Sequence, residues 1–293
     1  MSLLSMYIRY SFKKGDDERD AGLTTPAEVR RYDDIVYGKD PKWNRLDVYR
    51  PKDTDGKLPV IVSVHGGGWV YGDKERYQYY CLDLARRDFA VVNYTYGLAP
   101  RFKYPSQLDD TNEVFEWVMK HAEEYGLDRE NIFAVGDSAG GHLLALYASF
   151  LNNDEMASAY GLKRPEGLKL KGLALNCGVY QIDYEEKGMM KTLMSDLLKG
   201  KVTAERLKQI SPIYFVNEKF PPCIVMTAEG DFLKEQAMPM VNSLKEKGVD
   251  VTYKYYGDEN NVLGHVFHLR IKEKNAILCN DEECAFFKSL ISK

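Results

Sequence analysis

The sequence predicts one α/β domain in which a mostly parallel β-sheet carries helices on both faces. Short apolar runs rich in β-branched residues recur along the chain, and such runs are typical of strands covered on both faces. Segments with helical apolar spacing separate these runs, and strands that alternate with helices favour parallel pairing. A chain of 293 residues is long enough to bury one large core, so we expect a single domain over residues 1–293.

The predicted elements follow one another in a regular order. Strands are expected at residues 44–50, 59–64, 89–93, 132–135, 168–175, 223–227 and 249–256. Helices are expected at residues 107–121, 138–151 and 285–291. Residues 180–210 break this order, because they are helix-like and lie between two strands, which indicates an insertion above the sheet. Residues 1 to about 40 are polar and irregular, and we expect a solvated or flexible lead-in there.

Composition excludes several classes of protein. The net charge of -4 gives the chain no attraction to nucleic acid or to an anionic membrane. No apolar run approaches the ~18 residues of a membrane-spanning helix, and the N-terminus lacks the features of a signal peptide. Five scattered cysteines indicate reduced thiols and a cytoplasmic setting. Metal and cofactor motifs such as HExxH, a Walker loop or GxGxxG do not occur, so we predict neither group.

The segment Gly136-Asp137-Ser138-Ala139-Gly140 carries the strongest chemical signal. It lies between a predicted strand and a predicted helix, which is the context of a nucleophile elbow. The sharp turn holds the serine in a strained conformation, and the flanking glycines let strand and helix pass closely. We therefore predict Ser138 as a nucleophile. The alternative is a glycine turn with an idle serine.

A second motif, His65-Gly66-Gly67-Gly68-Trp69, directly follows the strand predicted at 59–64. Three consecutive glycines are entropically costly, and they fit a loop whose N–H groups must approach a ligand closely. Acyl transfer needs such donors, fixed in advance, for the oxyanion that forms. We assign the donors to Gly66, Gly67 and Ala139, and we expect His65 and Gly68 to support the loop.

Together these motifs resemble the HGGG-type esterases of the hormone-sensitive-lipase group within the α/β-hydrolase fold. The resemblance runs from about Leu58 to Leu269, and it includes Val91-Val92-Asn93-Tyr94, Tyr96-Gly97-Leu98-Ala99-Pro100 and Ser211-Pro212. The sequence departs from the family at Gly97, where arginine is usual, and at Arg101, where an acidic residue is usual. The resemblance implies a serine esterase with a triad of serine, histidine and an acidic residue.

The remaining triad members are assigned from the same resemblance. The base is expected after the last strand, and Leu263-Gly264-His265-Val266-Phe267 resembles the family's His-Gly-Phe segment, so we prefer His265 to His268. The segment Gly230-Asp231-Phe232-Leu233 resembles the family's Asp-Pro-Leu, which favours Asp231 over Glu229. The resulting chain order, Ser138, Asp231, His265, is the order expected of this fold.

The expected reaction is the two-step hydrolysis of short-chain acyl esters. Residues 1 to about 40 and the insertion at 180–210 are expected to form a small cap, which favours short acyl chains. Acetylated or feruloylated sugars and simple carboxylic esters are candidate substrates. The insertion carries an apolar stripe that either packs it onto the body or walls the acyl pocket: Met189, Met190, Leu193, Met194, Leu197 and Leu198.

Two alternatives stay open at this point. The first is a peptidase or amidase on the same fold, and the second is a hydrolase-like ligand-binding protein without turnover. The expected partner is a small-molecule ester, and the sequence leaves a homodimer open.

Overall fold

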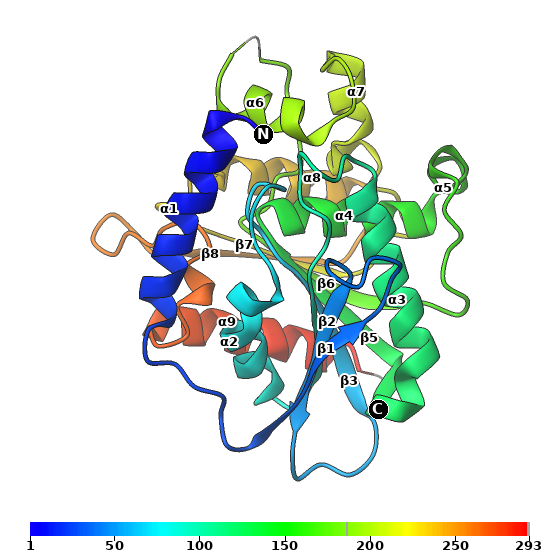
Figure 1. Ribbon diagram of the computed structural model, residues 1–293, viewed down its shortest axis with the longest axis vertical. Helices are drawn as coiled ribbons and strands as arrows, with labels where there is room; N and C mark the ends of the chain where they lie inside the picture. Colours follow the sequence, from blue (N-terminus) through cyan, green and yellow to red (C-terminus); the bar gives the residue numbers. More distant parts are fainter. Residues whose placement is uncertain (186, 292–293) are drawn as a thin grey trace.

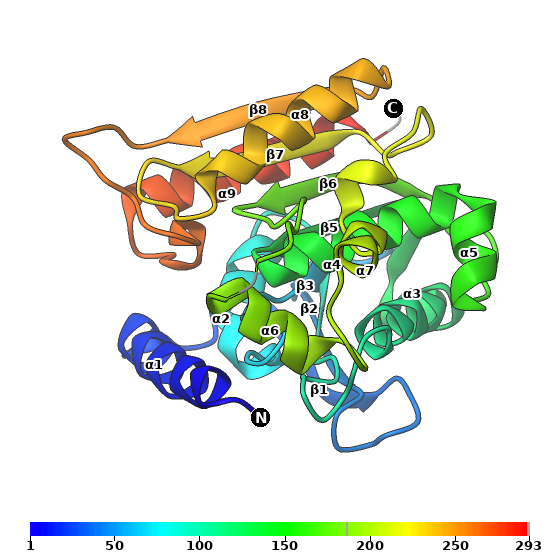
Figure 2. The ribbon, with the colours of Figure 1, turned by 90° about the horizontal axis from the view of Figure 1, so that it is seen from above.

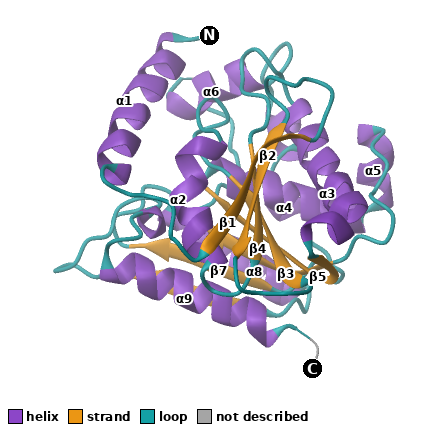
Figure 3. Ribbon diagram, turned by 60° about the horizontal axis from the view of Figure 1, so that its bottom comes forward, coloured by secondary structure: helices purple, strands orange, loops and turns teal. Residues whose placement is uncertain are grey.

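A computed structural model describes residues 1–185 and 187–291, and within them one mixed sheet of eight strands forms the centre of the molecule (Figure 3). The strand order is β1-β2-β4-β3-β5-β6-β7-β8. Strand β2 is antiparallel to β1 and β4, and the other neighbours are parallel. The strands are β1 (Val29–Val36), β2 (Arg45–Pro51), β3 (Leu58–Val64), β4 (Ala90–Tyr94), β5 (Leu127–Asp137), β6 (Leu170–Asn176), β7 (Cys223–Ala228) and β8 (Val251–Tyr256).

Helices cover both faces of the sheet, as Figure 1 shows. Buried side chains of α3, α4 and α8 pack on one face, and those of α2 and α9 pack on the other. The helices are α1 (Leu3–Asp20), α2 (Lys74–Ala85), α3 (Ser106–Tyr125), α4 (Ala139–Asn152), α5 (Asp154–Tyr160), α6 (Met189–Leu197), α7 (Ala204–Gln209), α8 (Ala237–Glu246) and α9 (Lys274–Ser289). Short 3₁₀ turns lie at Pro212–Tyr214, Lys234–Gln236 and Phe267–Leu269.

The apolar run that predicted β3 shows why helices must cover both faces of the sheet. Side chains alternate across a strand, so Val60, Val62 and Val64 enter the core beneath α3 and α4, whereas Ile61 enters the core beneath α2 and α9. All four side chains are buried. The two-faced burial confirms the prediction of a mostly parallel sheet between two helical layers.

The sheet also positions the chemistry. Strands β3, β5, β6, β7 and β8 run in parallel, so their carboxyl ends meet at one edge. The triple-glycine motif follows β3, the serine motif follows β5, and the segments that hold Asp231 and His265 follow β7 and β8. Open α/β sheets bind their ligands at this edge.

The N-terminal lead-in is ordered, which corrects the sequence prediction. Residues 3–20 form α1, and residues 29–36 form an edge strand. Ser2 caps the helix by accepting a hydrogen bond from the Ser5 amide. Charged side chains pair along this helix, as Lys13 does with Asp17, so the polar composition that indicated flexibility from the sequence instead stabilises the helix.

One other prediction needs correction: helix α9 begins at Lys274, eleven positions before the predicted start at 285. The helix-like insertion expected at 180–210 contains two short helices, α6 and α7, and Glu186 of that insertion lies outside the described residues. Helix α2 and strand β1 were not predicted, because their apolar residues follow no clear helical or strand period. The segment between Asp231 and His265 was expected to hold a helix and a strand, and α8 buries residues at helical spacing there: Ala237, Met240, Val241 and Leu244.

No helix in the described part of the chain is long and apolar enough to cross a bilayer. The five cysteines are buried free thiols.

A buried carboxyl on α9 supports the edge of the sheet that carries the serine. Glu283 accepts hydrogen bonds from Tyr80 Oη at 2.9 Å and from Asn176 Nδ2 at 2.8 Å. Asn176 ends β6, and its backbone oxygen accepts the Ser138 N–H at 3.0 Å. Burial raises the pKa of Glu283 to about 7. This carboxyl therefore ionises within the folded core near neutral pH.

The Glu283→Gln variant should gain stability over the native protein as pH rises. The pKa of Glu283 moves from 4.5 to about 7 on folding, so the stability that the neutral acid contributes is complete below about 4.5 and is lost as pH rises through 7. Glutamine cannot ionise, and the unpaired Asn176 Oδ1 can accept from its amide. Thermal unfolding between pH 5 and 8 should show a difference in unfolding free energy between the variant and the native protein that grows with pH to the order of 2–3 kcal/mol.

Glu282→Gln is the matched control for this experiment. Burial of Glu282 acts to raise its pKa, but hydrogen bonds from Tyr256 and Lys254 hold that pKa below its usual range. The control should therefore lose stability at neutral pH and little in acid. If the stability difference between Glu283→Gln and the native protein does not change with pH, Glu283 does not have the raised pKa in the folded protein.

Candidate active site

Ser138 sits at the turn between β5 and α4, in a conformation that few residues adopt. Its φ of 52° and ψ of -119° lie outside the ordinary regions for a side chain with Cβ. The turn is tight because Gly140 comes close to β3: a Cβ on Gly140 would lie 2.0 Å from the Val64 oxygen. The Ser138 side chain is partly exposed at the carboxyl edge of the sheet, where the sequence predicted the nucleophile.

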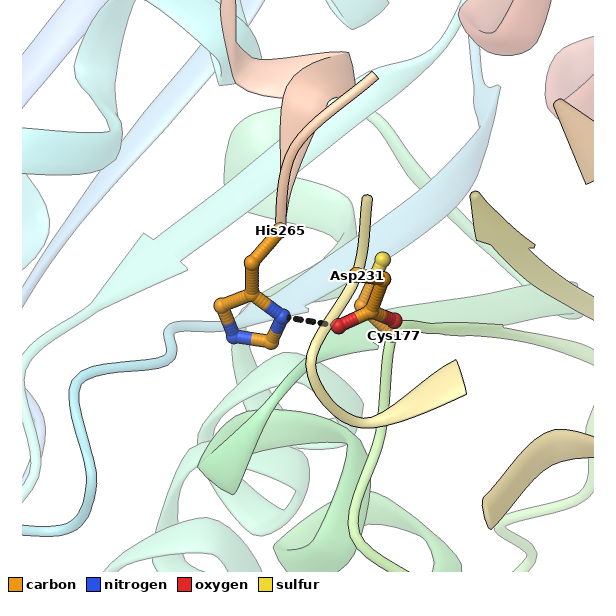
Figure 4. Close-up of side chains that lie close together, drawn as sticks. All are labelled: Cys177, Asp231 and His265. Carbon is orange, nitrogen blue, oxygen red and sulfur yellow. Dashed lines mark hydrogen bonds and ion pairs between the residues drawn. The ribbon is translucent and has the colours of Figure 1, made fainter. Parts of the chain in front are cut away.

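His265 and Asp231 form a hydrogen-bonded pair at the same edge (Figure 4). His265 Nδ1 and Asp231 Oδ1 are 2.6 Å apart, so the histidine donates from Nδ1 to the carboxylate. Asp231 is buried and also accepts hydrogen bonds from Thr227 Oγ1 and the Leu233 amide. Burial acts to raise the pKa of Asp231, but the hydrogen bond and charge of His265 together with these other donors hold that pKa below its usual range.

Ser138 and His265 line the same two small cavities, and the sheet therefore brings the three predicted residues together. Among the described residues, no hydrogen bond joins the Ser138 hydroxyl to the His265 ring. Such contacts are often long before a substrate binds and tighten in the complex. The Nδ1 donation to Asp231 leaves His265 Nε2 as the ring nitrogen that can accept a proton.

The glycine loop differs from the sequence prediction at its first donor. The Gly66 N–H donates to Tyr77 Oη at 2.8 Å, so this group already has a partner within the protein. In the part of the chain that the structure describes, the N–H groups of Gly67, Gly68 and Ala139 have no hydrogen-bond acceptor. Gly67 needs a glycine, because its φ is 113° and a Cβ would lie 2.2 Å from the Tyr71 oxygen. The unpaired donors are thus one residue further along than predicted.

His65 braces the glycine loop, and its pKa is too low for a catalytic base. It is buried, and its ring stacks on Tyr96 with the centroids 4.0 Å apart. Its Nδ1 lies 2.8 Å from the Gly66 oxygen. Burial lowers the pKa of His65 to about 4, so the ring is neutral at physiological pH.

His268, His142 and Glu229 line neither of the two cavities beside Ser138. His268 is buried, contacts the edge of the Tyr80 ring, and lines neither cavity. His142 accepts from Trp69 Nε1 and donates to the Ile210 oxygen, so both ring nitrogens are used within the fold. Glu229 pairs with Lys234 on the surface side of the strand end.

The two cavities differ in chemistry. One, of about 60 Å³, is apolar beside Ser138 and His265, and its wall includes Ile8, Phe12, Trp69, Val179, Met189, Met190, Leu193, Phe232 and Leu233. The other, of about 70 Å³, combines apolar side chains such as Val266 and Leu269 with charged and polar groups, and we call it the polar cavity because of those groups: Asp16, Arg19, Gly66, Gly67, Tyr71, Tyr77 and Asp137. Of the described residues, the two walls share only Phe12, Ser138 and His265, so the cavities lie on different sides of Ser138 and His265. A larger hollow of about 590 Å³ between α5, α7 and the turn at 212–214 contains none of these residues.

Helices α1 and α6 close the site from outside. Figure 2 shows α1 beside α2 and α6. Ser2 Oγ and Ser5 Oγ both donate to Asp196 Oδ2, at 2.7 and 2.6 Å, which ties the start of α1 to α6. The apolar stripe of the insertion serves both purposes considered from the sequence: Met194 and Leu197 pack into the core, and the residues 189, 190 and 193 line the apolar cavity.

Sequence reasoning missed the contributions of α1 and α2 to the site. Phe12, Asp16 and Arg19 come from the segment interpreted as a lead-in, and Tyr77 comes from an unpredicted helix. In the sequence, the i,i+3 spacing of Asp16 and Arg19 was the one signal that could have indicated helix α1. The two side chains form an ion pair at 2.8 Å.

Cys177 completes the cluster drawn in Figure 4, and the donor set does not fit a metal ion. The Cys177 sulfur, an Asp231 oxygen and a His265 nitrogen lie within 4.8 Å of one another. Burial raises the pKa of the Cys177 thiol well above its usual range, whereas metal binding requires the thiolate. His265 Nδ1 is already hydrogen-bonded to Asp231.

Comparison with known proteins gives the same picture. The BD-FAE family matches residues 46–243, which is more than half of the chain. Esterase LipC of Mycobacterium tuberculosis is 32% identical over 72% of this chain and 54% of its own length. Versiconal hemiacetal acetate esterase of Dothistroma septosporum is 30% identical over 71% of this chain and 67% of its own. The chain spans about half the length of LipC and of the related LipQ.

The fold is shared with solved esterases. Esterase B of Lactobacillus rhamnosis has a TM-score of 0.87 and 25% identity, with 98% of this chain and 95% of that chain covered. The same esterase has been solved inhibited by a tributyrin phosphonate. The sheet order, the strained serine turn and these matches together show an α/β-hydrolase fold, and the chain belongs to the BD-FAE family.

Proposed function

We propose that the protein is a serine carboxylesterase that hydrolyses short-chain acyl esters, with Ser138 as nucleophile, His265 as base and Asp231 as the acid that orients the base. One observation carries the proposal. His265, which is hydrogen-bonded to Asp231 at 2.6 Å, and the strained Ser138 line the same two cavities beside three N–H groups that are unpaired among the described residues. This combination of nucleophile, oriented base and free donors is the requirement for acyl transfer.

The first step follows from the positions of these groups. Ser138 Oγ attacks the ester carbonyl carbon while His265 Nε2 takes the hydroxyl proton. Asp231 fixes the histidine tautomer and stabilises the imidazolium. The N–H groups of Gly67, Gly68 and Ala139 donate to the oxyanion, in place of the set Gly66, Gly67 and Ala139 that the sequence favoured. His265 then gives its proton to the leaving alcohol, and the acyl group remains on Ser138.

The second step distinguishes the roles of the two cavities. A water molecule must reach the acyl carbon from the side that the alcohol has left, and His265 must take its proton. Polar groups hold water, whereas small apolar cavities stay dry. We therefore assign the acyl chain to the apolar cavity and the alcohol to the polar cavity beside Asp16, Arg19 and Tyr71.

Cavity size and the related proteins support a short acyl chain. The apolar cavity of about 60 Å³ is far smaller than the 300–1,000 Å³ of a typical drug-sized site. Acetate and tributyrin occur in the names of a relative and of a solved neighbour, respectively. An acetyl or butyryl group suits this cavity better than the bulky feruloyl group. A sugar or another hydroxylated alcohol suits the polar cavity.

The alternatives have less support. A peptidase that binds a free amino end needs an available carboxylate, but Asp16 is paired with Arg19 and accepts from Tyr71 Oη. A binding protein without turnover has no need for a buried acid aligned on a histidine beside a strained serine.

The first prediction from the proposed function concerns the nucleophile. The native protein should hydrolyse p-nitrophenyl acetate and butyrate and should form an adduct on Ser138 with a fluorophosphonate probe. Ser138→Ala should lower kcat by a factor on the order of 10⁴–10⁶ and abolish labelling. Ser149→Ala removes a hydroxyl from the same helix that donates only to the Ala145 oxygen, and it should keep both activities. Equal turnover by native protein and Ser138→Ala would contradict the mechanism.

The second prediction separates the two acidic candidates. Asp231→Asn should lower kcat about 10³- to 10⁴-fold with little change in KM, because the amide no longer holds the productive tautomer of His265. Glu229→Gln should leave kcat within about twofold, because Glu229 contacts Lys234 and Tyr255 and not the histidine. The reverse pattern of kcat values would remove Asp231 from the triad.

The third prediction concerns the acyl cavity. Met190→Ala should enlarge it and raise kcat/KM for p-nitrophenyl hexanoate over acetate by about tenfold, since one or two methylenes in an apolar pocket carry that much discrimination. Met238→Ala changes an exposed methionine on α8 and should leave the ratio unchanged. An unchanged ratio in Met190→Ala would place the acyl chain elsewhere.

A further inference from the structure

We infer that Tyr77 is a positioning residue that holds the oxyanion loop in register with the nucleophile turn. This inference rests on the proposed esterase function. Tyr77 Oη accepts the Gly66 N–H at 2.8 Å and donates to Asp137 Oδ2 at 2.8 Å. Gly66 directly precedes the donor Gly67, and Asp137 directly precedes Ser138. One hydroxyl therefore links the two segments whose separation sets the oxyanion hole.

The bridge lies where the sheet no longer connects these segments. The parallel β3–β5 ladder ends with Val64 opposite Gly136. Beyond that pair, the chain turns away to the glycine loop on one side and into α4 on the other. The Tyr77 hydroxyl spans this gap with two hydrogen bonds of ordinary length.

Two features show that the bridge fits this place closely. A Cβ on Gly66 would lie 2.8 Å from Asp137 Oδ2 and 2.9 Å from Tyr77 Oη, so glycine is needed where the three groups meet. Tyr77 and Asp137 are both buried, with 6% and 3% exposure, so their positions are fixed by packing. Buried hydrogen bonds of this kind are costly to leave unmade.

The bridge carries a charge-assisted hydrogen bond near neutral pH. Burial raises the pKa of Asp137 to about 6, while the Tyr77 hydrogen bond and the charges of His265 and Arg19 act to lower it. Glu283 on α9 adds repulsion from beneath the sheet. At pH 7.5 the carboxylate is thus mainly ionised, and it strengthens the bond from Tyr77.

The bridge acts on the transition state more than on the bound ester. The ester carbonyl carries little charge before attack, so a small shift of the loop changes ground-state binding slightly. The tetrahedral intermediate needs its donors in fixed positions, and a misplacement of about 1 Å can cost about 100-fold in rate.

The experiment combines Tyr77→Phe, Asp137→Ala and their double variant in a thermodynamic cycle at pH 7.5, with p-nitrophenyl butyrate as substrate. Each single change breaks the bridge, so each should lower kcat by about 10- to 100-fold with KM within about twofold. The double variant should lose no more kcat than the less active single variant, because either single change already breaks the bridge. Affinity for a trifluoromethyl ketone analogue should fall in parallel with kcat/KM.

Two further variants separate positioning from general loss of structure. Asp137→Asn keeps an oxygen that can accept from Tyr77, so it should retain more kcat than Asp137→Ala. Tyr94→Phe removes another buried hydroxyl, bonded to Thr111 away from the site, and should keep native kcat whatever its thermal stability. If Tyr77→Phe does not fold, the comparison of Asp137→Asn with Asp137→Ala tests the bridge from its other end.

The inference is overturned if Tyr77→Phe keeps kcat within about threefold of native, if the two changes are additive, or if Asp137→Asn and Asp137→Ala are equally active. Failure of the proposed function has a different signature. In that case the native protein neither turns over esters nor labels on Ser138.

Discussion

The close approach of the glycine loop to the serine turn is the constraint on which the site depends. Adjacent parallel strands β3 and β5 end at one edge of the sheet, and this places the two loops side by side. They can approach closely only because Gly66 and Gly140 lack Cβ atoms: a Cβ on Gly66 would lie 2.8 Å from Asp137 Oδ2, and one on Gly140 would lie 2.0 Å from the Val64 oxygen. A side chain at either position would push apart Ser138 and the donors of the proposed oxyanion hole.

The helices outside the sheet then decide what can reach Ser138. Of the helices that the structure describes, only α1 lines both cavities, and its Phe12 belongs to both. It is held at one end by Asp196 of α6 and near the other by Arg19, which donates to the Arg76 oxygen of α2. Arg19 is only 9% exposed and is surrounded by Asp16 and Asp20. The polar wall is therefore preorganised for the alcohol that we propose to bind there.

The sequence was sufficient for the parts of the fold that depend on local pattern. The apolar runs of β3 and β5 located the sheet edge, and the glycines around Ser138 identified the strained turn because few other residues fit it. The helix α1 was missed because its stability comes from contacts with α2 and α6 that no local period encodes. Nor did the sequence indicate that the Gly66 N–H is already paired, because its acceptor is Tyr77, eleven positions away on a helix whose aromatic residues have no clear periodicity. Residues that act through distant partners are thus the ones that pattern alone does not identify.

We propose that Ser138, His265 and the N–H groups of Gly67, Gly68 and Ala139 converge on one reacting carbon. A crystal structure of the protein inhibited by a butyl phosphonate would show whether they do. We expect a covalent bond from phosphorus to Ser138 Oγ, with the phosphoryl oxygen at about 2.7–3.1 Å from the nitrogens of Gly67, Gly68 and Ala139. The butyl chain should lie beside Met190, and the Gly66 N–H should stay on Tyr77. A phosphoryl oxygen that points away from the glycine loop, or an adduct on another residue, would exclude this convergence.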